Sequence, residues 1–237
     1  MASSRATARQ RRSPLSDDAA SARQKRAAAQ AAAELVQDGM RVGLGTGSTV
    51  AYLLPAIAAR EYANLRCVAT SPATEAAARA LGLKVETLDE VGELDLAIDG
   101  ADEIDPRGWL VKGGGGAHTR EKIVAASAKR FVVIASAEKA VTDLAPPVPL
   151  ELLAFGVQRT LLALDPAQLR DVEHSPDGGL IADYLGPVGD PGELAARLSA
   201  TAGVVEHGLF APELVSLILI ATDSGMERRA GAKPEDS

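Results

Sequence analysis

Short apolar runs alternate with Ala-rich stretches up to about Pro146. Apolar runs without strict alternation are typical of strands that are covered on both faces, and strands that alternate with helices indicate βαβ units. Strands are expected at Met40–Leu44, Leu65–Thr70, Lys84–Leu88, Leu94–Asp99 and Phe131–Ala135. Helices are expected from an N-cap at Ser16 to about Gln37, after Thr49 to about Arg60, and at Pro72–Leu81 and Thr119–Lys129. The pattern predicts an α/β fold with a Rossmann-like, largely parallel sheet flanked by helices.

The character of the chain changes near Pro146. The pattern then predicts helices at Phe155–Leu164 and Pro191–Thr201 and strands at Leu180–Tyr184 and Val204–Glu206. We expect a smaller α+β domain, residues 150–207, inserted before the last strand of the main sheet, Leu214–Ala221. The main domain then comprises residues 21–149 and 208–228, between disordered tails at 1–20 and 229–237. The polar residues after Met226 are expected to fray.

Composition narrows the possible functions. Hydrophobic residues make up 46% of the chain but aromatic residues only 3%, so the core must consist of Ala, Val, Leu and Ile. A net charge of −7 argues against general nucleic-acid binding. The sequence contains no stretch of about 18 or more uninterrupted apolar residues, so no transmembrane helix is expected. The single cysteine, Cys67, lies in an apolar run, which suits a buried thiol in a reducing cytoplasm. Two interpretations of the basic N-terminus remain, an organelle transit peptide and a disordered tail; its basic residues are Arg5, Arg9, Arg11 and Arg12.

A glycine-rich loop, Gly43-Leu44-Gly45-Thr46-Gly47-Ser48-Thr49, joins a predicted strand to a predicted helix. Loop N–H groups and a helix N-terminus bind phosphates at this position of α/β folds. Ser48 replaces the third glycine of a dinucleotide fingerprint, and the lysine of a Walker loop is missing. The hydroxyl donors suit a monophosphate pocket; the alternative is a tight turn in which Ser or Thr caps the helix.

An acidic loop, Asp99-Gly100-Ala101-Asp102-Glu103-Ile104-Asp105, follows the apolar strand that ends at Asp99. Carboxylates at the carboxyl end of a sheet strand lie where α/β proteins place their chemistry. Sugar binding with proton transfer, a metal site and a solvated acidic turn all remain open. The spacing does not match an EF-hand, and His118, His174 and His207 are too scattered in the sequence to predict a zinc site.

The segment Lys112 to Lys122 brings together a lysine, four consecutive glycines and a helix start. Glycines allow the backbone to approach a ligand closely. Glu121 lies in the first turn of the predicted helix, whose positive end should keep it ionised, so Glu121 could act as a general base. Lys112 could then stabilise an oxyanion. The alternative is ordinary helix-start chemistry. Lys139, after the strand Phe131–Ala135, could meet a phosphate or be merely solvated.

The segments Gly45–Thr49, Asp99–Glu103 and Lys112–Lys122, in this order and spacing, resemble ribose-5-phosphate isomerase of the A type. Further matches are Thr70-Ser71, Thr74 and Gly82. The resemblance extends over about residues 22–226 and is loose from Pro146 to Thr201. It implies interconversion of D-ribose 5-phosphate and D-ribulose 5-phosphate in the non-oxidative pentose phosphate pathway, without metal or cofactor, by a cytoplasmic homo-oligomer (dimer or tetramer).

The resemblance also implies roles for individual residues. Glu121 would move a proton between C2 and C1 through an enediolate, while Lys112, Asp99 and Asp102 would hold the sugar and assist proton movement. Substrate-binding positions would be Thr46, Gly47, Ser48, Thr49, Gly100, Ala101, Gly113, Gly114, Gly115, Lys139 and Lys25. His118 departs from the pattern, which is usually apolar there, and is expected to pack. Two other functions remain: a non-catalytic sugar-phosphate sensor, which would not need Glu121 with Lys112, and a CoA or acyl transferase on a related fold.

Overall fold

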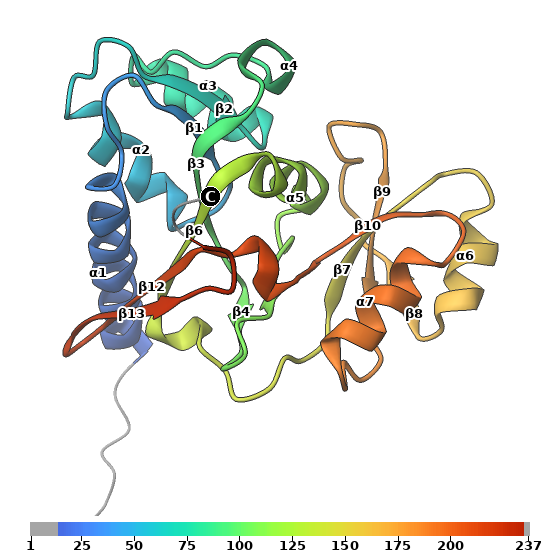
Figure 1. Cartoon of the computed structure of the whole chain (residues 1–237). Coiled ribbons are helices and arrows are strands. Elements are labelled where there is room, and N and C mark those ends of the chain that lie inside the picture. The colour runs from blue at the N-terminus through green and yellow to red at the C-terminus, as the bar shows by residue number, and fades with distance from the viewer. Residues whose placement is uncertain (1–13, 235–237) are drawn as a thin grey trace, which may run out of the picture.

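The computed structural model describes residues 14–234 and is built around a six-stranded sheet (Figure 1). Four neighbouring pairs in this sheet are parallel, and only the pair at the C-terminal edge is antiparallel. The strands lie in the order β13 (Gly225–Ala230), β12 (Leu217–Thr222), β6 (Ala128–Ser136), β3 (Leu94–Gly100), β1 (Arg41–Leu44) and β2 (Arg66–Ala69).

Helices cover both faces of this sheet, which explains the continuous apolar runs of its strands. On one face lie α1 (Pro14–Ala33), α2 (Val50–Ala58) and α3 (Pro72–Ala80); α5 (His118–Ala126) covers the other. Residues of β6 alternate between the two cores: Val132 and Ile134 pack with the alanines of α1, whereas Phe131 and Val133 pack with Val124 of α5. The expected α/β, Rossmann-like architecture is confirmed.

A second, four-stranded antiparallel sheet has its own apolar core and lies to the right in Figure 1. Its strands are β10 (Val204–His207), β7 (Val148–Leu152), β9 (Leu180–Tyr184) and β8 (Ala167–Leu169), with helices α6 (Val157–Leu164) and α7 (Pro191–Ser199). A three-stranded sheet is formed by β11 (Leu209–Phe210), β5 (Leu110–Val111) and β4 (Glu103–Ile104). In the chain, β4 and β5 come between β3 and β6 of the main sheet, and β11 comes between β10 and β12. The smaller α+β unit is therefore inserted before β12, as expected; its domain boundaries stay a prediction.

The order of the strands places one edge of the main sheet where a ligand site is expected. From β1 the chain moves to β2 on one side and then to β3 on the other. Parallel sheets bind ligands outside the carboxyl ends of two strands whose connections diverge in this way. Leu44 of β1 pairs with Ile98 of β3, so Gly45 and Asp99 follow side by side at this point.

Several local predictions were wrong for reasons that the structure shows. Lys84–Leu88 is not a strand: only Val85 forms an isolated bridge, to Cys67. Thr87 and Glu90 instead form a capping box that starts the short helix α4 (Leu88–Val91). Strand β7 was missed because prolines obscured it. Pro149 lies near its start, and the Pro149 carbonyl still accepts a hydrogen bond from the Gly208 N–H at 2.7 Å.

The two chain ends also differ from prediction. Helix α1 begins at Pro14 rather than after Ser16, since proline is favoured in a first helical turn. Residues 14–20, assigned to the tail, therefore belong to the helix; residues 1–13, including the four basic positions, lie outside the described residues. The expectation of fraying after Met226 is wrong, because Gly225–Ala230 forms strand β13 along β12, which is thus not the last strand. Residues 235–237 lie outside the described range.

Candidate active site

A cavity of about 140 Å³ opens at the carboxyl ends of β1 and β3. It brings together every predicted site residue except Asp99 and Lys25. Its lining consists of Thr46, Gly47, Ser48, Thr49, Gly100, Ala101, Asp102, Lys112, Gly113, Gly114, Gly115, Glu121 and Lys139. Asp99 lies buried directly behind this lining, in contact with Lys112. These residues come from four separate segments of the chain.

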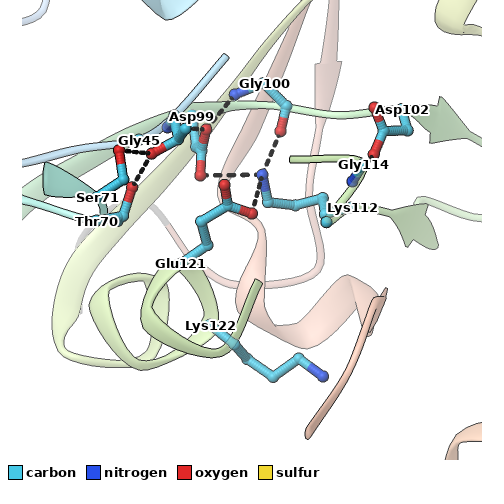
Figure 2. A network of polar contacts seen from close by, with 12 residues as sticks. Gly45, Thr70, Ser71, Asp99, Gly100, Asp102, Lys112, Gly114, Glu121 and Lys122 are labelled. Carbon is cyan, nitrogen blue, oxygen red and sulfur yellow. Dashed lines mark hydrogen bonds and ion pairs between the residues drawn. The ribbon is translucent and has the colours of Figure 1, made fainter. Parts of the chain in front are cut away.

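Three buried charges meet at the centre of this site (Figure 2). The Nζ atom of Lys112 lies 2.9 Å from Oδ2 of Asp99 and 3.2 Å from Oε2 of Glu121. It also donates a hydrogen bond to the Gly100 carbonyl at 2.6 Å. The ammonium group therefore forms two ion pairs with carboxylates and donates one hydrogen bond. The side chains of Lys112, Asp99 and Glu121 are only 3%, 4% and 5% exposed.

Burial and mutual charge shift the pKa values of this cluster. Burial lowers the pKa of Lys112, but attraction to Asp99 and Glu121 outweighs it, so the pKa lies above its usual range. Burial and the charge of Asp99 raise the pKa of Glu121 to about 8, although Lys112 opposes the shift. Burial likewise raises the pKa of Asp99. Burial therefore opposes the ionised state that the helix N-terminus is expected to favour at Glu121.

Asp99 is fixed by the backbone at the end of β1. Its Oδ1 atom accepts hydrogen bonds from the N–H groups of Thr46 at 3.1 Å and Gly100 at 2.7 Å. A side chain at Gly45 would overlap the Asp99 carboxyl group, so only glycine allows this close approach. The carboxylate therefore ties the glycine-rich loop to Lys112.

Hydroxyl groups hold the same loop from the other side. Thr46 Oγ1 lies 2.8 Å from the hydroxyl oxygens of Thr70 and Ser71. Thr74 Oγ1 donates to the Gly45 carbonyl at 2.9 Å. Ser71 is also the N-cap of α3, accepting from the Thr74 N–H. The sequence identified Thr70, Ser71 and Thr74 only through the resemblance; their support of the loop was missed, and the hydroxyl residues at a predicted helix start were the available signal.

The opposite end of the cavity consists of backbone and hydroxyl groups. Gly47, with a φ of +128°, and Ser48 are exposed, and Thr49 immediately precedes α2. The Thr49 side chain makes no capping hydrogen bond, which disfavours the interpretation that it caps the helix. The N-terminus of α2 thus faces the cavity with its partial positive charge.

The two lysines predicted near a phosphate occupy different places. Lys139 ends the 3₁₀ helix η1 (Ala137–Lys139) and lines the cavity. Lys25 lies on α1 and does not line it. Its neighbour Gln24 accepts a hydrogen bond from the Ala137 N–H at 3.0 Å, so α1 packs against the start of η1.

The glycine run that follows Lys112 forms another wall of the cavity. The Gly114 N–H donates to Oδ2 of Asp102 at 2.8 Å. His118 is fully buried beneath the run, where a side chain at Gly113 would lie 2.6 Å from its Nδ1 atom. Burial lowers the pKa of His118 to about 4, so the ring is neutral and packs, as expected.

A larger cavity, about 910 Å³, lies along the other side of α5. Thr119, Arg120 and Ile123 line it, but Lys112 and Glu121 do not. The charged cluster therefore identifies the smaller cavity as the candidate site. Within the described part of the chain, no three His, Cys, Asp or Glu side chains are grouped so as to hold a metal ion, and no helix there is long and apolar enough to cross a membrane.

The fold and this cavity together define an α/β enzyme of the sugar-phosphate isomerase class. The chain belongs to the ribose 5-phosphate isomerase A (phosphoriboisomerase A) family, whose profile matches residues 66–225. The resemblance inferred from the sequence is thereby confirmed.

Relatives and solved structures agree with this assignment. Ribose-5-phosphate isomerase A of Caulobacter vibrioides is 48% identical over 220 residues, covering 86% of this chain and 96% of the relative. The Lacticaseibacillus paracasei protein of the same name is 43% identical over 217 residues, covering 86% and 94%. A crystal structure of ribose 5 phosphate isomerase A from Neisseria gonorrhoeae has a TM-score of 0.84 at 30% identity, covering 89% of this chain and 97% of that one. A D-ribose-5-phosphate isomerase in complex with phospho-erythronic acid has a TM-score of 0.82 at 31% identity, covering 88% and 98%.

Proposed function

We propose that this chain interconverts D-ribose 5-phosphate and D-ribulose 5-phosphate by proton transfer, with Glu121 as the base. The observation that carries the proposal is the buried contact of Glu121 with Lys112, 3.2 Å apart, in a cavity that also receives the N-terminus of α2. An α-hydrogen of a sugar carbonyl is only weakly acidic. Its removal requires a positioned base and stabilisation of the oxyanion that forms.

In the proposed reaction Glu121 removes the hydrogen from C2 of the open-chain aldose. The electron pair forms the C1–C2 double bond, and negative charge moves to the oxygen on C1, giving an enediolate. Return of the proton from Glu121 to C1, with transfer of the hydroxyl proton on O2 to the oxygen on C1, gives the ketose. Asp102, which lines the cavity, holds the sugar and assists the proton movements at its oxygens, whereas Asp99, buried behind the lining, acts through Lys112.

The contacts of Lys112 suggest how its ammonium group stabilises the negative charge that develops on the enediolate oxygen. Its ammonium group is held by ion pairs with Asp99 and Glu121 and by a hydrogen bond to the Gly100 carbonyl. When Glu121 accepts the proton from C2, it loses its charge and its hold on Lys112. The ammonium group can then turn one donor toward the enediolate oxygen, so the stabilisation strengthens as the transition state forms. A base with a pKa of about 8 suits such a transfer near neutral pH.

The phosphate of the substrate would bind at Gly45–Thr49 and the N-terminus of α2, with Lys139 and, more remotely, Lys25 supplying positive charge. A solved relative, at 31% identity, is in complex with phospho-erythronic acid. That compound carries a phosphate at one end and a carboxylate at the other, and the carboxylate resembles an enediolate in charge and shape. We expect it to inhibit this chain competitively.

The deciding experiment is isomerisation of ribose 5-phosphate in deuterium oxide. Proton transfer through an enediolate should yield ribulose 5-phosphate with deuterium at C1, detectable by NMR, because Glu121 exchanges its proton with solvent. Product without deuterium, together with a kcat close to wild type for Glu121→Gln, would point to hydride transfer and exclude Glu121 as the base. No conversion would reject the proposal altogether.

We also infer that the chain acts in the cytoplasm as a homo-oligomer, a dimer or a tetramer, which sedimentation analysis would test. A non-catalytic sugar-phosphate sensor would bind the substrate without converting it. A CoA or acyl transferase would require CoA for turnover. The buried Glu121–Lys112 contact favours the isomerase over both, since neither binding nor acyl transfer needs a base with a raised pKa.

A further inference from the structure

One side chain of the smaller sheet reaches the glycine run of the cavity. Arg170 directly follows β8, and its Nη1 atom donates hydrogen bonds to the carbonyls of Gly113 at 3.2 Å and Gly114 at 2.9 Å. The guanidinium is fixed on its other edge by Asp183 of β9, with Nε–Oδ2 and Nη2–Oδ1 distances of 2.7 and 2.6 Å. Both side chains are largely buried, at 18% and 19% exposure.

The register of the smaller sheet explains why these groups face the glycine run together. The Arg170 N–H donates to the Ile181 carbonyl, so Arg170 lies opposite Ile181 and diagonal to Asp183. Residues so placed share a face of a sheet. Ile181 itself packs under the run, since a side chain at Gly116 would lie 3.3 Å from its Cγ1 atom. One face of β8 and β9 therefore forms the floor beneath residues 113–116.

The carbonyl contacts determine where the adjoining N–H groups point. In a planar trans peptide the C=O and the following N–H are directed oppositely. Because the Gly113 carbonyl faces Arg170, the Gly114 N–H points away from it, and it donates to Asp102 at 2.8 Å. By the same rule the Gly115 N–H points away from Arg170, and Gly115 lines the cavity.

We propose that Arg170 is a positioning residue that, through the carbonyls of Gly113 and Gly114, aims the Gly115 N–H at a substrate oxygen and holds Asp102 through the Gly114 N–H. This inference rests on the proposed isomerase function and adds to it a donor at the reacting end of the sugar. Arg170 does not touch the substrate, because the backbone of the run lies between them.

A second ion pair joins the same parts of the molecule and serves as the matched control. Arg120 of α5 binds Asp177 through two contacts of 2.7 Å each. It faces the larger cavity and donates to no carbonyl of the glycine run. If Arg170 only fastened the smaller sheet to the rest, Arg120→Met and Arg170→Met should have similar consequences.

The test measures kcat for ribose 5-phosphate and the inhibition constants of phospho-erythronic acid and inorganic phosphate. Removal of one oxyanion donor commonly lowers kcat about 10²- to 10³-fold, and loss of its positioning should have a smaller effect, about 10- to 100-fold for Arg170→Met. Inhibition by phospho-erythronic acid should weaken about tenfold or more, the size of one lost charge-assisted hydrogen bond. Inhibition by inorganic phosphate, which occupies only the other end of the cavity, should stay as in the wild type.

Arg120→Met should leave all three quantities close to wild type. Arg170→Lys keeps the charge beside Asp183 but lacks the planar fork needed to reach both partners, so it decides the matter if Arg170→Met does not fold. Unchanged kcat and phospho-erythronic acid inhibition in a folded Arg170 variant would overturn the inference, as would parallel loss of phosphate inhibition. If the wild-type enzyme is active, these outcomes overturn only the role of Arg170 and leave the proposed isomerase function intact. If the wild-type enzyme is inactive, both the proposed function and the role of Arg170 are rejected.

Discussion

The two ends of the cavity have opposite physical designs. At one end, Lys112, Asp99 and Glu121 form a buried cluster of formal charges, each with a shifted pKa. At the other, Gly47 and Ser48 are exposed, and the binding groups are backbone dipoles, hydroxyls and Lys139. Burial gives the charges control over proton affinity, while dipoles at a helix N-terminus attract an anion and need little desolvation. Chemistry and affinity should therefore be separable by mutation.

The largest effect should come from Glu121→Gln. The amide keeps the size of the side chain but cannot accept the proton, and removal of a general base lowers kcat about 10²- to 10⁴-fold. Binding of phospho-erythronic acid, measured by calorimetry, should be retained. Glu193→Gln is the control, since Glu193 also lies in the first turn of a helix, α7, but outside the cavity. A kcat close to wild type for Glu121→Gln would contradict the assigned base.

Removing the phosphate from the substrate tests the opposite end. Charge-assisted hydrogen bonds to an anion contribute about 1.5–3 kcal/mol each. The loss of two or three should lower kcat/KM for free ribose by roughly 10³-fold or more. Inorganic phosphate should inhibit competitively. Comparable kcat/KM values for the two sugars would mean that the Gly45–Thr49 loop is only a structural turn.

The pH dependence tests the buried end. Glu121 must lose its proton to act as the base, and its pKa is raised to about 8 by burial and by Asp99. The value of kcat/KM, which reports the free enzyme, should fall about tenfold for each pH unit below that pKa, since the ionised fraction falls in this proportion. A pH-independent kcat/KM between pH 6 and 8 would show that the base is ionised throughout.

The same pKa shift predicts a change in stability. Between the ordinary value of 4.5 and about 8, the folded chain binds more protons at Glu121 than the unfolded chain does. The free energy of unfolding should therefore decrease as the pH rises through this range. Denaturant titrations should show a smaller decrease for Glu121→Gln, which has no proton to lose.

A smaller effect is expected from Ser48→Ala. One hydroxyl donor to the phosphate is lost, so KM for ribose 5-phosphate should rise about tenfold, with less change in kcat. Ser224→Ala, in the turn between β12 and β13, is the control. A lower kcat at unchanged KM would place Ser48 at the reacting end instead.

No effect is expected from removal of divalent metal ions. Asp99 is occupied by Lys112 and two N–H groups, which leaves the acidic loop poorly arranged as a ligand set. Activity after exhaustive EDTA treatment and dialysis should equal that of untreated enzyme. Activity that disappears and returns with magnesium or manganese would contradict this view of the aspartates.

Local patterns in the sequence predicted much of this molecule. Strand β9 has its expected bounds. The segments that line the cavity were each predicted to be functional from their glycines, their carboxylates or a helix start. Features set by distant contacts were not predictable in this way. The direction of the Glu121 pKa shift depends on burial and on the charge of Asp99, and the contact of Arg170 with the glycine run spans more than 50 residues. The sequence of strand β13 is typical of a polar tail because most of its side chains are exposed to solvent.

That edge strand has a consequence for the solubility of the protein. Strand β12 has the sequence Leu-Ile-Leu-Ile-Ala-Thr, without a charge or a proline, and such a segment with an unpaired edge is a template for aggregation. Strand β13 covers this edge along its whole length and presents Glu227, Arg228 and Arg229 in its place. A chain ending at Ser224 would keep every group that lines the cavity. It would, however, expose the unpaired backbone N–H and C=O groups of β12 and self-associate through them.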